Sequence, residues 1–192
     1  MDSRIKSIEF IEDKHEYWFT DEQGRHRRLH GVTGVIGKLM GKSFPDTDTV
    51  RIATMYGHDV HKSSEMWIKE GREPSTEGGK WLVGMLEKFA KENGVAKYLA
   101  ELLVSDFIGT ASCIDIVAIH EDGKATLFDI KTTSRFDRPY CSLQLSCYKK
   151  LFEACYGMKV EGMYVLATKP KRLFKILEQE ENRVQKILDM NK

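Results

Sequence analysis

The sequence predicts an α/β fold with a mixed central β-sheet flanked by helices, and three observations lead to this prediction. Helix-like and strand-like segments follow one another in the order helix, strand, strand, strand, helix, strand, which is typical of a sheet with crossover helices. Two central segments are apolar at almost every position, as expected for strands buried on both faces. The length of 192 residues and the hydrophobic content of 41% suffice for one domain with a sizeable core.

The composition limits the class of protein. With 31% charged residues beside that hydrophobic content, the chain is unlike a disordered or low-complexity sequence. No apolar run approaches the ~20 residues of a membrane span, and no apolar segment follows Met1, so we expect a cytoplasmic protein without membrane contact. The 4 cysteines show no CxxC spacing, and we expect reduced thiols rather than a zinc or iron–sulfur site.

The N-terminal third predicts a β-ribbon. β-Branched and aromatic residues recur over Ile5–Ile11 and Tyr17–Thr20, and turn-forming residues follow at Asp21–Gly24. A short apolar segment comes next, at Val32–Ile36. We therefore assign residues 1–45 to an N-terminal extension of the fold.

Apolar periodicity and flanking caps predict two helices and a strand before the centre of the chain. Asp48 or Thr49 is a suitable N-cap for the first helix, and Gly94 is a suitable stop for the second. A loop rich in Gly, Pro, Ser and Thr separates the two helices. The predicted elements are a helix over Val50–Lys69, the loop Gly71–Gly79, a helix over Lys80–Glu92 and a strand over Glu101–Phe107.

The second half of the chain predicts the centre of the sheet and two more helices. Pro170 interrupts the pattern before the last amphipathic segment. We expect one domain over residues 1–192, with its core at 50–168 and a C-terminal helix within 171–192. The predicted elements are strands over Ile114–Ile119 and Ala125–Lys131, a helix over Ser142–Tyr156, a strand over Gly162–Thr168 and a charged helix over Leu173–Met190.

Two aspartates stand inside the otherwise apolar central strands, where an unpaired charge is costly. A three-residue loop, Glu121–Gly123, with Gly123 in the left-handed conformation, is a common hairpin closure. In that register Asp115 and Asp129 are equally far from the loop and therefore become cross-strand neighbours on one face. Lys131 then projects from the same face. A loop with an even number of residues would place the aspartates on opposite faces.

Two buried like charges at neighbour distance repel unless a cation lies between them. Oxygen ligands suit Mg²⁺ or Mn²⁺, which lower the pKa of a bound water and stabilise charge on a phosphate. Lys131 then orients the attacking water or neutralises the transition state. The alternative is an ordinary hairpin in which Asp129 and Lys131 form a surface pair. Glu101, on a preceding strand, is either a further site residue or a surface residue.

Two helical pairs surround these carboxylates. Gln144 and Tyr148 lie four residues apart and share a helix face, where they either support the site or belong to the helix surface. Gly57 and His61 also share a face, and a neutral imidazole is a suitable metal ligand. A structural role for His61 stays open, and His58 is a nearby competitor for the role of ligand.

In this order, the residues resemble the PD-(D/E)XK nuclease superfamily and, more narrowly, its RecB-type exonuclease branch. The motifs are Gly57…His61, Asp115, Asp129-Ile130-Lys131 and Gln144…Tyr148. The segment Leu29–Ile36 also looks like the entry of phage-type and mitochondrial-genome-maintenance exonucleases, and the resemblance runs from about Tyr17 to Thr168. Relatives often have Gly where Ser112 stands, and the iron–sulfur members have a cysteine N-terminal to the site, whereas none precedes Cys113.

The resemblance implies a restriction-endonuclease-like core and a role for each motif. His61, Asp115, Asp129 and the Ile130 carbonyl would bind Mg²⁺ or Mn²⁺, and no iron–sulfur cluster is expected. Lys131 would be the catalytic lysine, together with the catalytic Asp115 and Asp129. Gln144, Tyr148 and Glu101 are the predicted supporting residues.

Local charge points to DNA although the total of 30 basic and 29 acidic residues gives a net charge of only +1. Phosphate binding needs clustered cations near the site rather than a high total. Lys149 and Lys150 fit a solvated helix face, whereas the loop after the second aspartate fits a DNA contact. A further basic cluster lies at Arg25–Arg28. The predicted DNA-binding residues are Arg135, Arg138, Lys169, Lys171 and Arg172.

We therefore expect a metal-dependent DNA exonuclease, bacterial or phage-encoded, that acts at free duplex ends or on single strands during recombination, repair or replication. A recombination or replication protein is a further expected partner. Two alternatives remain: a non-catalytic DNA-binding or recombination-accessory module on the same fold, and a structure-specific endonuclease. Cleavage of RNA also stays open, because nothing in the sequence senses a 2′-hydroxyl.

Overall fold

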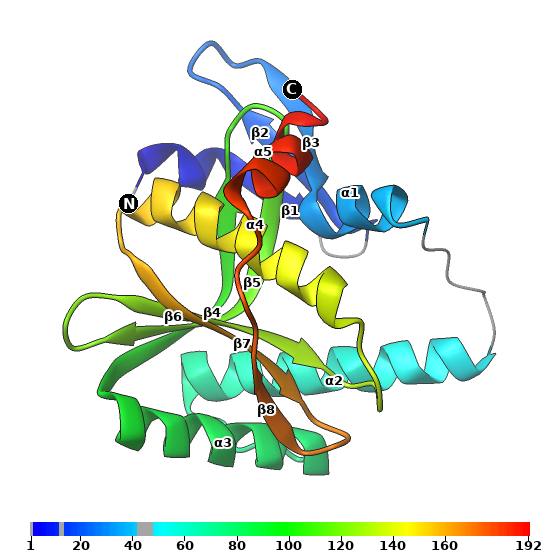
Figure 1. The fold of residues 1–192 in the computed structure, drawn as a ribbon, viewed down its shortest axis with the longest axis vertical. Coiled ribbons are helices and arrows are strands. Elements are labelled where there is room, and N and C mark those ends of the chain that lie inside the picture. Colours follow the sequence, from blue (N-terminus) through cyan, green and yellow to red (C-terminus); the bar gives the residue numbers. More distant parts are fainter. Residues whose placement is uncertain (1, 12–13, 42–47) are drawn as a thin grey trace.

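The computed structural model describes residues 2–11, 14–41 and 48–192, and in these residues one eight-stranded mixed sheet carries helices on both faces (Figure 1). The strand order is β1-β2-β3-β5-β6-β7-β8, and β4 pairs with the remaining side of β5. The predicted α/β class with a mixed sheet is thus confirmed. The expected boundary between N-terminal extension and core falls partly at residues 42–47, which lie outside the described part of the chain.

The N-terminal residues form a three-stranded antiparallel ribbon. The expected strand over residues 5–11 is wrong at its start, because the side chain of Asp2 accepts a hydrogen bond from the Arg4 amide and caps a 3₁₀ turn. The Asp21 carboxylate accepts bonds from two turn amides and closes the second hairpin. The elements are η1 (Ser3–Ser7), β1 (Ile8–Ile11), β2 (Glu16–Thr20), β3 (His26–Gly31) and α1 (Val32–Leu39).

Helices α2 (Asp48–Glu70) and α3 (Glu77–Asn93) cover one face of the sheet. Helix α3 begins three residues before its predicted start, because the Thr76 hydroxyl accepts a hydrogen bond from the Gly79 amide and caps the helix. It ends where predicted, at Gly94, whose φ of 59° is left-handed. The described part of α2 already includes Asp48, one of its two expected N-caps.

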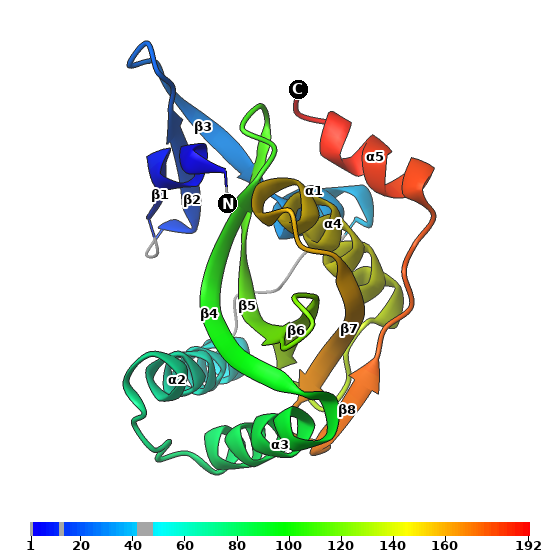
Figure 2. The same cartoon turned by 90° about the vertical axis from the view of Figure 1, so that its left-hand side faces the viewer.

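The central hairpin has the predicted register. Strands β5 (Thr110–His120) and β6 (Ala125–Lys131) pair from Ile116 with Phe128 to Ile119 with Ala125. The His120 amide donates to the Lys124 carbonyl at 2.9 Å, and Gly123 has a φ of 81°, so the three-residue loop closes as expected. Strand β4 (Val95–Ser105) starts six residues before its expected position and pairs along nearly all of β5. Both strands bend strongly (Figure 2).

The opposite face is covered by α4 (Arg138–Tyr156), with β7 (Val160–Ala167) parallel to β6. The predicted C-terminal helix over residues 173–190 is wrong. Its first residues form β8 (Arg172–Lys175), which pairs with the open edge of β7, and only α5 (Glu181–Asp189) is helical. The extended segment between them is fixed to α4, where the Ser142 hydroxyl donates to the Leu177 carbonyl.

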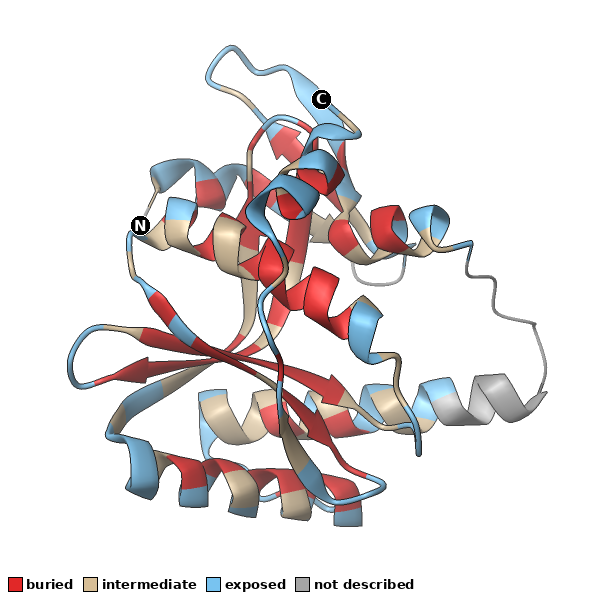
Figure 3. Cartoon of the chain, viewed as in Figure 1, coloured by how far each residue is buried: buried red, intermediate tan, exposed pale blue. Residues whose placement is uncertain are grey.

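Two hydrophobic clusters hold the layers together, and the buried residues follow the sheet (Figure 3). One cluster lies between the sheet and α1, α4 and α5, and the other between the sheet and α2 and α3. Because every residue of β6 except Lys131 is buried, the prediction of strands buried on both faces is correct. None of the helices among the described residues is long and apolar enough to cross a membrane.

Candidate metal centre

The site lies where the sheet opens. On the side of β5 away from β4, the pairing with β3 covers Thr110 and Ala111, and the pairing with β6 resumes at Ile116. Residues 112–115 therefore have no ladder partner on that side within the described chain. The Asp115 carboxylate replaces part of the missing ladder, because its Oδ2 accepts a hydrogen bond of 2.7 Å from the Ile130 amide.

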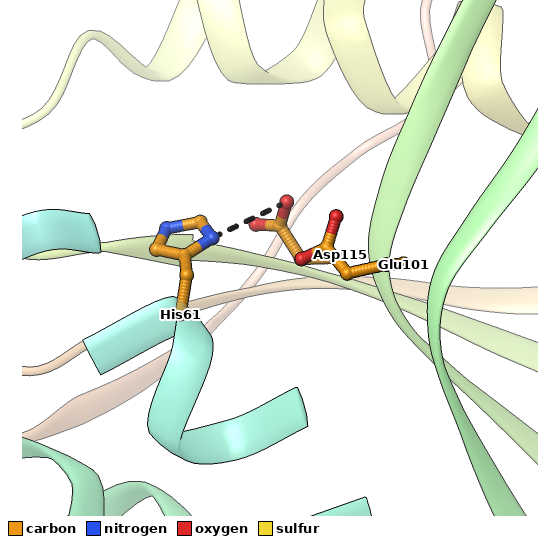
Figure 4. A group of neighbouring side chains, drawn as sticks. All are labelled: His61, Glu101 and Asp115. Carbon is orange, nitrogen blue, oxygen red and sulfur yellow. Dashed lines mark ion pairs between the residues drawn. The ribbon is translucent and has the colours of Figure 1, made fainter. Parts of the chain in front are cut away.

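Three side chains from three elements converge at this opening (Figure 4). His61 comes from α2, Glu101 from β4 and Asp115 from β5, and one ligand atom of each lies within 4.8 Å of the others. The His61 Nδ1 is 3.7 Å from the Asp115 Oδ1, and the two side chains keep 32% and 16% of their surface exposed. A ligand thus reaches the group from solvent. His58, the competing histidine, is exposed on α2 and lies outside the group.

Glu101 is held in an unfavourable state. Its φ of 52° is left-handed, which is costly for a residue with a side chain. Burial, and next the charge of Asp115, raise its pKa to about 7. The Cys113 thiol, whose own pKa is raised by burial and by Glu101, donates a hydrogen bond of 3.2 Å to its Oε2. A divalent cation would relieve this repulsion, so two carboxylates and one imidazole fit such an ion.

The second predicted aspartate sits beside these three residues in its own hydrogen-bond network. The Asp129 Oδ1 accepts a hydrogen bond of 2.9 Å from the Lys131 ammonium and one of 2.7 Å from the Gln144 amide. Lys131 also lies 2.8 Å from the Asp129 Oδ2, although no hydrogen bond reaches that buried oxygen. The Gln144 amide donates in addition to the Tyr148 hydroxyl at 3.1 Å. The structure therefore joins Asp129, Lys131, Gln144 and Tyr148 in one cluster.

Charge in this cluster is balanced by the lysine. Burial raises the pKa of Asp129, and the Lys131 ammonium opposes this rise. Burial by itself lowers the pKa of Lys131, but the charge of Asp129, the other nearby acidic groups and the hydrogen bond to Asp129 together outweigh it and raise that pKa. Lys131 is therefore an ammonium at neutral pH. It serves as a hydrogen-bond donor and positive charge, and not as a proton acceptor.

A buried chain of hydroxyls continues from this cluster to the ribbon. The Ser112 hydroxyl donates to the Tyr148 hydroxyl at 3.1 Å. Tyr17 of β2, whose pKa is raised by burial, shares a further hydrogen bond with Ser112. The sequence showed Ser112 only as a departure from the family pattern and Tyr17 only as a strand residue. Burial of a tyrosine beside a strand gap is a tertiary feature without a local signal.

Two further site predictions fall close to these groups. The Ile130 amide donates a hydrogen bond to Asp115, while the role of the Ile130 carbonyl as a metal ligand stays a prediction. Gly57 lies against the segment after β6, because a Cβ at this position would be 3.1 Å from the Thr132 hydroxyl. That contact places the middle of α2, and with it His61, next to the end of the strand that bears Lys131.

The basic residues divide into paired and unpaired cations. Lys149 and Lys150 are neutralised by Glu178 and Glu181, which agrees with their expected place on a solvated helix face. Lys171, a predicted DNA contact, pairs with Glu77 of α3. The remaining predicted contacts are all exposed, and they are Arg135, Arg138, Lys169 and Arg172.

The basic cluster of the ribbon is occupied by local partners. Arg25 pairs with Asp21 and Arg28 with Glu16, while the Arg27 guanidinium donates to the Phe107 carbonyl at 2.5 Å. Each of these cations already has a partner within the fold. This end of the molecule therefore offers less uncompensated charge than the sequence indicates.

No protein-family model matches the chain, and no curated protein matches it. Among solved structures, a protein named "putative exonuclease" from Eubacterium rectale is 10% identical, with 84% of this chain and 76% of that chain covered and a TM-score of 0.42. The protein SSO0001 is 18% identical, with 81% and 80% covered and a TM-score of 0.35. Likenesses at this level do not establish an activity, and the functional conclusion rests on the site itself.

Proposed function

We propose that the protein is a divalent-metal-dependent phosphodiester hydrolase that acts on DNA, a nuclease of the PD-(D/E)XK type. One observation carries this proposal: the ligand atoms of His61, Glu101 and Asp115 converge beside the ion pair of Asp129 and Lys131. A cluster of oxygen and imidazole donors next to a half-buried ammonium is suited to hydrolysis of a phosphate ester.

The proposed ion is Mg²⁺ or Mn²⁺, because the donors are mainly carboxylate oxygens. When bound, it would activate a water and stabilise charge on the phosphate oxygens. The Asp115 Oδ1 faces His61, while its Oδ2 accepts a hydrogen bond from the Ile130 amide. One oxygen of this carboxylate would therefore bind the ion, and the other fixes the orientation of the carboxylate. The family resemblance adds Asp129 and the Ile130 carbonyl to the ligand set, and the Asp129 Oδ2 is a buried oxygen without a hydrogen bond.

Lys131 and Gln144 have distinct proposed roles. The Lys131 ammonium would stabilise the negative charge that develops on the phosphate, as its raised pKa requires. Gln144 would hold the Asp129 carboxylate in position through its hydrogen bond of 2.7 Å. Tyr148 in turn would fix Gln144, so its role is positioning rather than contact with substrate.

The proposed substrate is DNA, taken at free ends or as single strands, with a recombination or replication protein as a proposed partner. The exposed arginines beside the end of β6 supply positive charge for the phosphate backbone.

The test uses purified protein with labelled single-stranded, linear duplex and covalently closed circular DNA, in Mg²⁺, Mn²⁺ or EDTA. We expect degradation of linear DNA with either metal, none in EDTA, and resistance of circles. Asp129→Asn and Lys131→Met should each reduce the rate by about 100-fold or more, whereas Lys88→Ala, an exposed change on α3, should not. A wild-type protein inert toward every substrate and metal would overturn the proposal, and cutting of circles would make it an endonuclease.

A further inference from the structure

Two guanidinium groups share one aromatic ring next to the proposed site. The Cζ of Arg138, the first residue of α4, lies 5.0 Å from the centre of the Phe174 ring, and the Cζ of Arg172 lies 5.5 Å from it. Phe136 contacts the same ring edge-on, with centres 5.2 Å apart. We call Arg138, Phe174 and Arg172 the arginine sandwich.

Strand register puts the arginine sandwich on the face that bears Asp129 and Lys131. Lys131 pairs with Ala167, which pairs with Arg172, and side chains in one such row share a face. The next row on that face joins Asp129, through β7, to Phe174. Strands β6 and β8 are two strand spacings apart, so the backbone of Arg172 lies about 10 Å from that of Lys131 across the sheet.

Among the described residues, no carboxylate pairs with the two arginines of the arginine sandwich. Both arginines are exposed, and neither forms an ion pair with any described residue. The neighbouring lysines differ, because Lys149, Lys150 and Lys171 each pair with a glutamate. Two exposed cations on one ring have like charges, and an anion bound beside them offsets that charge.

The geometry identifies the class of anion. Guanidinium groups bind phosphate through two parallel N–H donors, and an aromatic ring that holds them limits their freedom beforehand. A backbone separation of about 10 Å is short compared with the length of an oligonucleotide. A strand cleaved beside Lys131 therefore passes the arginine sandwich within a few nucleotides of the cleaved bond.

We propose that the arginine sandwich is a phosphate-binding subsite that binds a nucleic-acid strand within a few nucleotides of the bond that is cleaved. The subsite itself is defined by its own contacts and charges, while its distance from the cleaved bond rests on the proposed function. The subsite is expected to control binding of long substrates without acting on the reacting atoms.

The first test measures binding without cleavage, so that its outcome does not depend on enzymatic activity. Fluorescence anisotropy of a labelled single-stranded 12-mer is recorded against salt in EDTA. The double variant Arg138→Ala/Arg172→Ala should bind at least tenfold more weakly, and its salt slope should fall by about 1.4, since each phosphate contact on a single strand contributes about 0.7. Lys175→Ala is the matched control, because Lys175 is exposed on the same strand and its register places it on the opposite face.

An unchanged affinity in the double variant, or an equal loss in Lys175→Ala, would overturn the subsite. Because the altered side chains are exposed, we expect the folded state to be retained, which thermal unfolding verifies. Phe174→Leu keeps both charges and tests the ring, and it should weaken binding by a smaller factor than the double variant. Loss of binding in the double variant together with an inert wild-type enzyme would support the subsite and refute only the proposed function.

The second test locates the subsite relative to the reaction. With bis(p-nitrophenyl) phosphate, a diester too small to reach the arginine sandwich, the double variant should lose much less of its kcat/KM than it loses with oligonucleotides. With oligonucleotides, it should raise KM at nearly constant kcat, and the defect should disappear for substrates too short to reach from the cleaved bond to the arginine sandwich. An equal defect on the small diester would place these arginines at the reacting phosphate and contradict the proposed position.

Discussion

Replacement of Glu101 by glutamine tests the electrostatics of the metal centre. Glu101→Gln keeps the shape and hydrogen-bonding capacity of the side chain and removes its charge. In the metal-free protein, burial and the charge of Asp115 disfavour that charge, which raises the pKa of Glu101 to about 7 from the ordinary value of 4.5. Removing the charge should therefore stabilise the protein wherever the carboxyl is ionised in the unfolded chain.

The magnitude follows from linkage between protonation and folding. Below pH 4.5 the carboxyl is protonated in both states, so it contributes no pH dependence. Between pH 4.5 and about 7 the folded state binds the extra proton, and the free energy of unfolding falls as pH rises. From pH 5 to pH 8 the wild-type protein should lose about 2–3 kcal/mol through this group.

The assay is urea unfolding in EDTA at pH 5, 6, 7 and 8, and Glu101→Gln should flatten the profile over this range. Glu77→Gln is the matched control, because the Glu77 carboxylate is exposed and pairs with Lys171. Saturating Mn²⁺ at pH 8 should restore about 2.7 kcal/mol in the wild type at 100 times its dissociation constant. Identical pH profiles for wild type and Glu101→Gln would refute the claim that Glu101 is forced against Asp115.

Three further changes test the cluster around Asp129. Lys131→Met should destabilise the protein by about 3 kcal/mol at pH 8, because the buried Asp129 carboxylate loses its cation. The loss should be smaller at pH 5, where Asp129 can take up a proton. Urea unfolding at both pH values measures the difference in the free energy of unfolding. Tyr148→Phe removes two hydrogen bonds and should cost about 1–2 kcal/mol of stability, which thermal unfolding detects; no loss would mean that the hydroxyl is not used. Gln144→Leu should change the free energy of unfolding by no more than about 1 kcal/mol, because the loss of two hydrogen bonds is offset by removal of a buried carbonyl without a partner. The same variant should lower kcat roughly tenfold in the DNA assay. A change in KM alone would contradict a positioning role for Gln144.

The hairpin of the two aspartates was predictable because its determinants are local. The length of the loop and the glycine at its third position set the register, and the register sets which side chains share a face. The four-residue spacing of Gln144 and Tyr148 likewise placed both on one side of α4.

The rest of the site depends on tertiary pairing. Glu101 meets Asp115 because β4 pairs with β5 in a register that joins Ala100 to Ile116 and Leu102 to Ile114 on either side of them. Ser112 and Tyr17 meet at a gap between strands that are far apart in sequence. Residues 173–175 have helical periodicity but form a strand, because the open edge of β7 offers hydrogen bonds that outweigh local preference.

The most direct test of the central claim is calorimetric titration of Mn²⁺ into the metal-free protein at pH 8, compared with Asp115→Asn. The asparagine keeps an oxygen to accept the Ile130 amide and removes the negative charge, so the fold around the site should persist. A metal centre at His61, Glu101 and Asp115 predicts saturable binding to the wild type and its loss in the variant. Absence of saturable binding to the wild type, or equal binding by Asp115→Asn, would contradict it.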